Sequence, residues 1–210
     1  MDIPEERISG VITALTQGTK QDQQSALEDY FLPNAYFIHP FCRVPSFGNI
    51  RLPFAPYTIN SRWLVQLIYQ WYRMLSPNVE LAIDSTSFDK NNNLLYVTIR
   101  QAFTLWFVPF NLWRANVKLV TVLELEHLPV SGDDFAIERA RLYFIKGQED
   151  HYQTSEFVKF IAPWGASLIW IAWQLLATLV CAVCTVIFRP VTSFRERVVS
   201  THGSKASKRH

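Results

Sequence analysis

The feature that most constrains this chain is a run of 29 residues near its C-terminus, Phe160 to Phe188, without a charged side chain or a histidine. A helix needs about 20 apolar residues to cross the hydrocarbon core of a bilayer, so the run is long enough to span one. Lys159 and Arg189 bracket it. Amphipathic indole rings favour the headgroup level, and three tryptophans gather near its start: Trp164, Trp170 and Trp173. We expect a membrane anchor, with a buried core helix as the alternative.

The run divides the chain into a domain at 1–159, a hydrophobic anchor helix at 160–188, and a basic tail at 189–210 that we expect to be disordered. A single span places residues 1–159 in the cytosol and the basic tail across the membrane, against the positive-inside tendency. The alternative is a helix that lies in the interface with both ends cytosolic. The weak polar stripe of the run favours the tail anchor, and the sequence leaves the organelle open.

Charge and motif content exclude several classes of function. The net charge of +2 argues against broad electrostatic binding to nucleic acid, and three cysteines imply no disulfide framework. No cluster of His, Cys and Asp has metal-ligand spacing, and no glycine-rich phosphate loop is present. We therefore expect neither a metal nor a cofactor.

Hydrophobic periodicity predicts an α+β fold. Three helices are expected in the N-terminal half, the third at 61–75, with a short strand at 35–39 and a long loop at 41–60. Alternation with a period of two predicts four further strands, at 79–84, 95–107, 117–126 and 135–146. Three helices followed by a largely antiparallel curved sheet are typical of this fold class.

Five short segments carry a resemblance to a known family: HPFCR at 39–43, SRWL at 61–64, WY at 71–72, WFVP at 106–109 and FVKF at 157–160. In combination they resemble the fungal SigF-like subfamily of the nuclear-transport-factor-2-like superfamily, over most of residues 1–190. The resemblance implies a cone-shaped sheet curled around a pocket, with helices closing its narrow side. Members of the superfamily include isomerases, dehydratases and cyclases, and others only bind ligands or partners, so the fold does not decide the function.

Two candidate acid–base residues follow from the sequence. His39 ends the short strand and is a candidate general base near neutral pH. The alternative is a structural hydrogen bond to the loop after it. Asp150 and His151, placed after the last predicted strand, form a second candidate pair, with a solvated turn as the alternative.

Polar and aromatic residues on the strands are candidates for a ligand pocket, because a few polar groups among aromatic rings are typical of small-molecule sites. The alternative is a solvent-facing surface of the sheet, and the choice depends on which face is concave. The candidates are Tyr36, Tyr96, Arg100, Trp106 and Glu124.

Three functions are consistent with these features. The preferred one is a membrane-anchored module that holds a lipid, sterol or terpenoid-like molecule next to the bilayer. An isomerase, dehydratase or cyclase is the enzymatic alternative, and it requires His39 or Asp150 in an enclosed pocket near another polar group. The third is an adaptor that dimerises through the fold. A homodimer is also suggested by small and weakly polar residues on one face of the apolar helix: Gln174, Thr178, Cys181 and Thr185.

Overall fold

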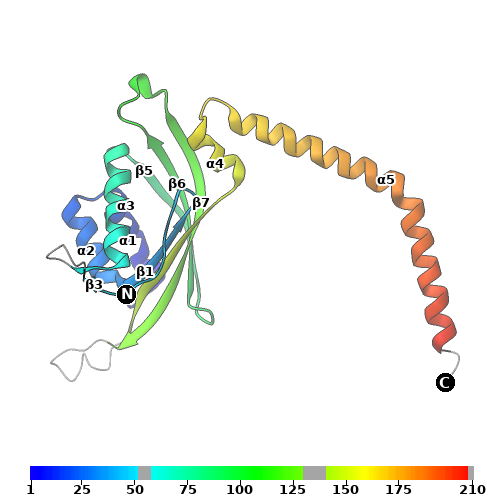
Figure 1. The fold of residues 1–210 in the computed structure, drawn as a ribbon, viewed down its shortest axis with the longest axis horizontal. Helices are drawn as coiled ribbons and strands as arrows, with labels where there is room; N and C mark the ends of the chain where they lie inside the picture. The colour runs from blue at the N-terminus through cyan, green and yellow to red at the C-terminus, as the bar shows by residue number, and fades with distance from the viewer. Residues whose placement is uncertain (52–57, 130–140, 208–210) are drawn as a thin grey trace. The chain divides into compact units, whose positions relative to one another are not determined.

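The computed structural model of the chain describes residues 1–51, 58–129 and 141–207 (Figure 1). The chain divides into two compact units, Met1–Ala166 and Ser167–His210. The first unit contains a sheet with helices packed on one of its faces. The described part of the second, up to Ser207, is helix.

Three helices form the layer that covers the sheet: α1 (Pro4–Gln17), α2 (Lys20–Tyr30) and α3 (Ser61–Leu75). Each begins where the sequence provides a starting signal. Pro4 occupies the first turn of α1, where its missing N–H costs nothing. Thr19 and Asp22 form a reciprocal capping box on α2. The Asn60 side chain accepts a hydrogen bond from the Trp63 N–H at 2.9 Å and so caps α3.

The sheet has six strands in the order β2-β1-β8-β7-β6-β5. They are β1 (Phe31–His39), β2 (Cys42–Val44), β5 (Glu80–Asp89), β6 (Leu94–Thr104), β7 (Arg114–Pro129) and β8 (Arg141–Tyr152). Neighbouring strands are antiparallel except β1 and β8, which are parallel, so the sheet is mixed. The strands β3 (Ile50–Arg51) and β4 (Thr58–Ile59) pair separately.

Alternation along the strands separates an apolar face from a polar one. On β7, Val117, Leu119 and Leu123 are buried, whereas Lys118 between them is exposed. The buried face packs against Ile8 of α1 and Leu27 of α2, which are almost fully enclosed. The core therefore lies between the helices and the inner face of the curved sheet (Figure 1).

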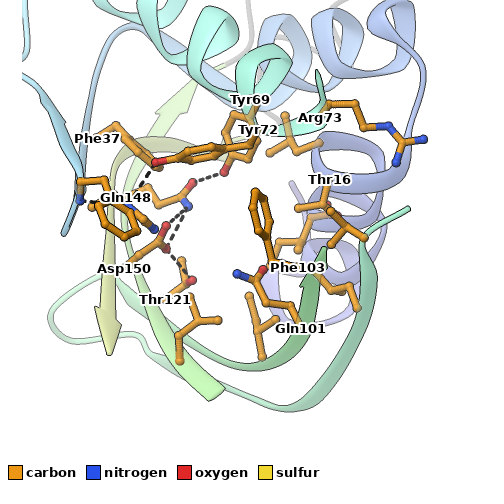
Figure 2. Close-up of a pocket in the computed structure, with 18 of the residues that line it drawn as sticks. Thr16, Phe37, Tyr69, Tyr72, Arg73, Gln101, Phe103, Thr121, Gln148 and Asp150 are labelled. Atoms are coloured by element: carbon orange, nitrogen blue, oxygen red, sulfur yellow. Dashed lines mark hydrogen bonds between the residues drawn. The ribbon is translucent and has the colours of Figure 1, made fainter. Parts of the chain in front are cut away.

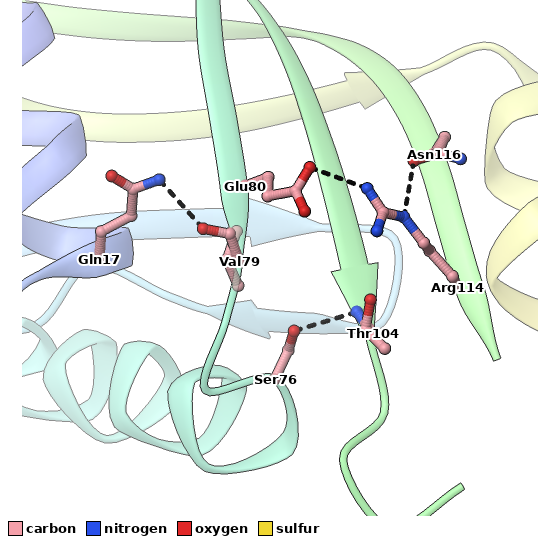
Figure 3. Close-up of polar contacts among 7 residues, drawn as sticks. All are labelled: Gln17, Ser76, Val79, Glu80, Thr104, Arg114 and Asn116. Atoms are coloured by element: carbon pink, nitrogen blue, oxygen red, sulfur yellow. Dashed lines mark hydrogen bonds and ion pairs between the residues drawn. The ribbon is translucent and has the colours of Figure 1, made fainter. Parts of the chain in front are cut away.

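Polar contacts fix the ends of these elements where α3 meets the sheet (Figure 3). The Ser76 hydroxyl, directly after α3, accepts a hydrogen bond from the Thr104 N–H at 3.0 Å. Gln17 at the end of α1 donates to the Val79 carbonyl at 3.0 Å. These bonds hold the C-terminal ends of α1 and α3 against β5 and β6.

The described part of the C-terminal region contains two helices. Phe160 and Ile161 belong to a separate short helix, α4 (Thr154–Ile161), and the long helix α5 (Ala166–Ser207) begins only after Gly165. Its segment Ala166–Phe188 has a mean hydropathy of 2.2 and is long and apolar enough to cross a membrane. The helix continues to Ser207.

The α+β class, the three N-terminal helices and the curved sheet are confirmed. Strands β1, β5 and β7 are longer than predicted, whereas β6 ends at Thr104 and not at residue 107. The last strand, β8, extends to Tyr152 instead of ending near Lys146, and residues 135–140 of its predicted range lie outside the described part of the chain. Asp150 and His151 therefore lie within a strand and not in a turn.

We expect Gly147 to tolerate no side chain. A Cβ atom there would lie 2.0 Å from Cε1 of Tyr36, whose hydroxyl is held by a hydrogen bond to Glu124 at 3.0 Å. Overpacking of this kind costs about 1–3 kcal/mol, so Gly147→Ala lowers the free energy of unfolding by that amount. Circular dichroism during thermal unfolding in detergent measures the change.

Gly10→Ala is the matched control. A Cβ atom at Gly10 meets nothing within 4 Å, and an alanine in the middle of α1 stabilises the helix by about 0.5–1 kcal/mol. Equal effects of the two substitutions would contradict the close packing of Tyr36 on Gly147.

Candidate functional site

A cavity of about 370 Å³ lies between the helices and the inner face of the sheet (Figure 2). Most of its wall is carbon, from α1, α3 and strands β5 to β8. Phe41 and Trp71 line it and are about half exposed, so the cavity opens beside them. The same end of the cavity is framed by further apolar side chains: Phe103, Leu105, Trp113 and Phe160.

A row of polar side chains crosses the inner face of β7 and β8. The Thr121 hydroxyl donates to Oδ1 of Asp150 at 2.7 Å. The Gln148 amide donates to Oδ1 and Oδ2 of the same carboxylate, at 3.1 and 3.3 Å. All three residues line the cavity, and Figure 2 shows them together on one side of it.

The tyrosine on α3 above this row fixes the orientation of the amide. The Tyr69 hydroxyl donates to Oε1 of Gln148 at 2.8 Å. A carboxamide that accepts at its oxygen presents its nitrogen to other partners, so the Gln148 N–H groups point to Asp150. Burial raises the pKa of Tyr69, so its hydroxyl keeps the proton that it donates.

Asp150 is a carboxyl group in an apolar setting. Burial raises its pKa, and the hydrogen bonds from Thr121 and Gln148 oppose that rise. The surface that it keeps accessible faces the cavity. Among the described residues, Oδ2 accepts only the longer of the Gln148 bonds. The carboxylate therefore retains the capacity to accept a proton or a hydrogen bond from a molecule in the cavity.

A second polar network surrounds His39 near the opening. The backbone N–H of Phe41 donates to Nδ1 of His39 at 3.3 Å, so in the neutral ring the proton is on Nε2. Nε2 lies 3.3 Å from the Tyr152 hydroxyl, which also accepts from the Gln101 amide at 3.3 Å. The Tyr72 hydroxyl lies 3.2 Å from Nδ1 and can donate to it. Because the Tyr152 oxygen accepts hydrogen bonds from His39 and Gln101, the proton of its own hydroxyl can point to a ligand.

Burial lowers the pKa of His39 from 6.5 to about 4. The ring is therefore neutral at neutral pH and is a weak base there. His39 lines the cavity, as the catalytic hypothesis requires, and it also bonds to the loop after it, as the structural alternative requires. Its geometry is that of a neutral donor that orients Tyr152.

The five pocket candidates do not line the cavity. Four of them lie on the other face of the sheet, because the helices cover the apolar face and the cavity forms on that side, and Trp106 lies in the loop after β6. Arg100 pairs with Asp84 at 2.7 Å, and Tyr36 donates to Glu124, which also binds Lys146 at 2.8 Å. Tyr96 and Trp106 are exposed.

The acid–base pair of Asp150 and His151 is also separated. Adjacent residues of a strand point to opposite faces, so Asp150 faces the cavity whereas His151 is exposed and lies 3.4 Å from Glu149.

Thr121, Gln148 and Tyr152 were missed as site residues. The signal for Thr121 is present in the sequence, as a polar residue that interrupts the buried alternation of Val117, Leu119, Leu123 and Leu125 on β7.

Among the residues that the structure describes, no group of three or more His, Cys, Asp or Glu side chains is arranged to hold a metal ion. The side chains of the site supply its polar groups. It has one carboxylate with a raised pKa and several neutral hydroxyl and amide groups, all facing an apolar space.

The two buried groups predict opposite effects of pH on stability. The unfolded chain protonates His39 near pH 6.5 and the folded protein only near 4, so acidification through this window favours unfolding. We expect acidification between these pH values to lower the free energy of unfolding by about 3 kcal/mol through His39. His39→Gln removes this pH dependence. Denaturant unfolding at a series of pH values measures the slope.

Asp150→Asn is the complementary variant. Because the folded protein raises the pKa of Asp150, this residue contributes stability in acid and loses it as pH rises. We expect Asp150→Asn to be more stable than the parent at pH 8 and to lose stability more steeply on acidification. The same slope in the parent and in both variants would show that neither side chain is buried as described.

Comparison with known proteins agrees with this fold. The profile of the SigF NTF2-like domain matches residues 1–192. No curated protein matches the chain. Solved structures with a similar fold include a protein with a ketosteroid isomerase-like fold from Catenulispora acidiphila, in complex with trimethylamine. Its sequence identity is 12% and the TM-score 0.45, over 72% of this chain and 88% of that one.

Two NTF2-like proteins are similar to the same extent. The one from Burkholderia pseudomallei has 12% identity and a TM-score of 0.44, over 73% of this chain and 96% of its own. The one from Anabaena variabilis has 9% identity and a TM-score of 0.44, over 71% and 88%. Because the family profile spans most of the sequence, the chain belongs to the SigF NTF2-like domain family.

Proposed function

We propose that this protein is a membrane-anchored module that binds a hydrophobic small molecule carrying one polar group. The observation that carries the proposal is the cavity of about 370 Å³, walled mainly by carbon, with a polar row on one side and a second polar network near its opening. Its volume falls within the range of about 300–1,000 Å³ that is usual for ligand sites. A lipid, sterol or terpenoid-like molecule has the corresponding chemistry.

The polar row and the Tyr152 hydroxyl together define the group that the ligand presents. Tyr152 has a hydroxyl proton available to donate, and Asp150 has an oxygen available to accept. A hydroxyl or carbonyl group at one end of an apolar ligand satisfies these side chains, and the rest of the ligand contacts the aliphatic and aromatic wall. An entirely apolar ligand would leave the remaining donor capacity of Tyr152 and acceptor capacity of Asp150 unused, which is unfavourable in a buried site.

The apolar segment Ala166–Phe188 supports the anchoring part of the proposal. In this arrangement residues 1–159 face the cytosol, and the bilayer is both the partner of the helix and the source of the ligand. The homodimer and the fungal source suggested by the sequence remain predictions.

A second candidate function is acid–base catalysis on an apolar metabolite by an isomerase, dehydratase or cyclase. It is favoured by Asp150, whose raised pKa and position in the cavity are typical of a general base. In this reaction the carboxylate removes a proton from a carbon next to a carbonyl group. The Tyr152 hydroxyl donates a hydrogen bond to the carbonyl oxygen, and the proton returns to a different carbon.

Filling the cavity tests the binding function. Leu119 lines the cavity, and we expect Leu119→Trp to lower the affinity for a fluorescent sterol such as dehydroergosterol by at least about tenfold, because the larger ring occupies the space of the ligand. Val120→Trp on the outer face of the same strand is the control and leaves the affinity unchanged. Equal affinity in both variants would place the ligand elsewhere.

Exchange at carbon tests the catalytic candidate. We expect the full-length protein to incorporate deuterium from D₂O into the α-carbon of a hydrophobic enone such as cholest-4-en-3-one, measured by mass spectrometry. Loss of a general base lowers such a rate by about 10²–10⁴-fold, so Asp150→Asn abolishes measurable exchange. If the parent protein binds the enone without deuterium exchange, the catalytic candidate is excluded and only the binding function is retained.

A further inference from the structure

The loop between β6 and β7 exposes apolar side chains at the mouth of the cavity. This rim loop, Leu105–Trp113, contains no charged residue. Leu105 and Trp113 at its two ends line the cavity. Between them the apolar side chains point to solvent, with Phe110 93% exposed and Trp106 67% exposed, and Phe107 and Leu112 more than half exposed.

This exposure belongs to an ordered loop. The Leu105 N–H donates to the Trp113 carbonyl at 3.1 Å, and the Trp106 N–H donates to the Leu75 carbonyl at the end of α3 at 3.3 Å. A short 3₁₀ turn, Pro109–Asn111, holds Phe110 at φ 57° and ψ 25°, a left-handed conformation disfavoured for a residue with a Cβ atom. The backbone is thus fixed in a conformation that presents a phenylalanine to the solvent.

The rim loop is tied to the residue that precedes the candidate membrane span. The Trp164 indole N–H donates to the Leu112 carbonyl at 2.6 Å, and its ring packs edge-on against Trp113 with centroids 4.9 Å apart. The candidate span begins at Ala166, two residues after Trp164. Consecutive Cα atoms are about 3.8 Å apart, so Trp164 lies within about 8 Å of the first residue of the span.

We propose that the rim loop, together with Trp164, inserts into the headgroup region of the bilayer, so that the mouth of the cavity opens against lipid. Trp and Phe side chains favour this region of the bilayer. Because the loop has no charged residue, its insertion does not require a charged side chain to lose its hydration. The occupant is a lipid surface because covalent continuity with the span keeps the loop near one. The exchange of ligand with the bilayer rests on the proposed binding function, whereas the insertion itself rests only on the span.

A fluorescent label on the full-length protein in phosphatidylcholine vesicles tests the insertion. The label is attached to Phe110→Cys in a background of Cys42→Ala, Cys181→Ala and Cys184→Ala. The control position is Asn92→Cys, in the turn at the other end of β6, about 35 Å along the strand from the rim loop (Figure 1). Brominated phospholipids quench by contact within the bilayer, and iodide quenches from water.

We expect bromolipids to quench the label at position 110 by about half and to leave the label at position 92 unchanged, with the reverse for iodide. If the label at position 110 remains open to iodide in vesicle-bound protein, the insertion is wrong and the surface docks a protein instead. If the protein does not float with the vesicles, both the span and the insertion are wrong.

A transfer assay tests the role of the loop in ligand exchange. We expect Phe107→Ser with Phe110→Ser to slow the transfer of dehydroergosterol from vesicles by about tenfold and to leave its equilibrium affinity in detergent unchanged. Tyr96→Ser, which removes an exposed aromatic ring from the outer face of the sheet, is the matched control. An unchanged transfer rate in the loop variant would contradict a role of the rim loop in ligand exchange. If the parent protein binds no sterol, the sterol is wrong as the ligand, and the quenching result still tests the insertion.

Discussion

The cavity depends on a mismatch in length between the sheet and the helices that cover it. Strand β7 has 16 residues and extends about 50 Å along its path, whereas α3 has 15 residues and is only about 22 Å long. Three such helices cannot cover the whole apolar face of the sheet. The sheet curves around them, and the uncovered part of its inner face becomes the wall of a cavity that opens near the ends of α1 and α3.

Within this cavity the polar row has a cost for stability. Asp150 is surrounded by protein, and burial disfavours its charged form. Core packing alone would be better served by a residue such as valine at this position, because a buried carboxylate must be compensated by hydrogen bonds. Thr121 and Gln148 each donate to the Asp150 carboxylate and supply that compensation, and Tyr69 orients the Gln148 amide. Such an arrangement is typical of a site that is maintained for recognition or chemistry.

The sequence predicts the parts of this structure that rest on periodicity. The spacing of apolar residues predicts the three helices, and alternation predicts the strands. The family resemblance predicts how these elements are arranged. Of the inner polar row the sequence predicts only Asp150, as a candidate acid–base residue, because the last strand is expected to end near Lys146, before Gln148 and Asp150. Alternate residues of a strand point to the same face, so a strand that is expected to end near Lys146 does not place Gln148 and Tyr152 on the inner face beside Asp150. The outer-face candidates failed for the same reason: alternation separates two faces without showing which one is concave.

The source of the ligand determines what the cavity must provide. A molecule that moves from lipid into a carbon-walled cavity exchanges one apolar environment for another and gains little from the hydrophobic effect. An apolar wall therefore supplies shape but little net affinity for a lipid-derived ligand. Hydrogen bonds in a dry site are the interactions that the bilayer core cannot offer. The affinity and the selectivity of the cavity then come mainly from Asp150, Gln148 and Tyr152, and this is why one row of polar groups matters more than the many apolar residues around it.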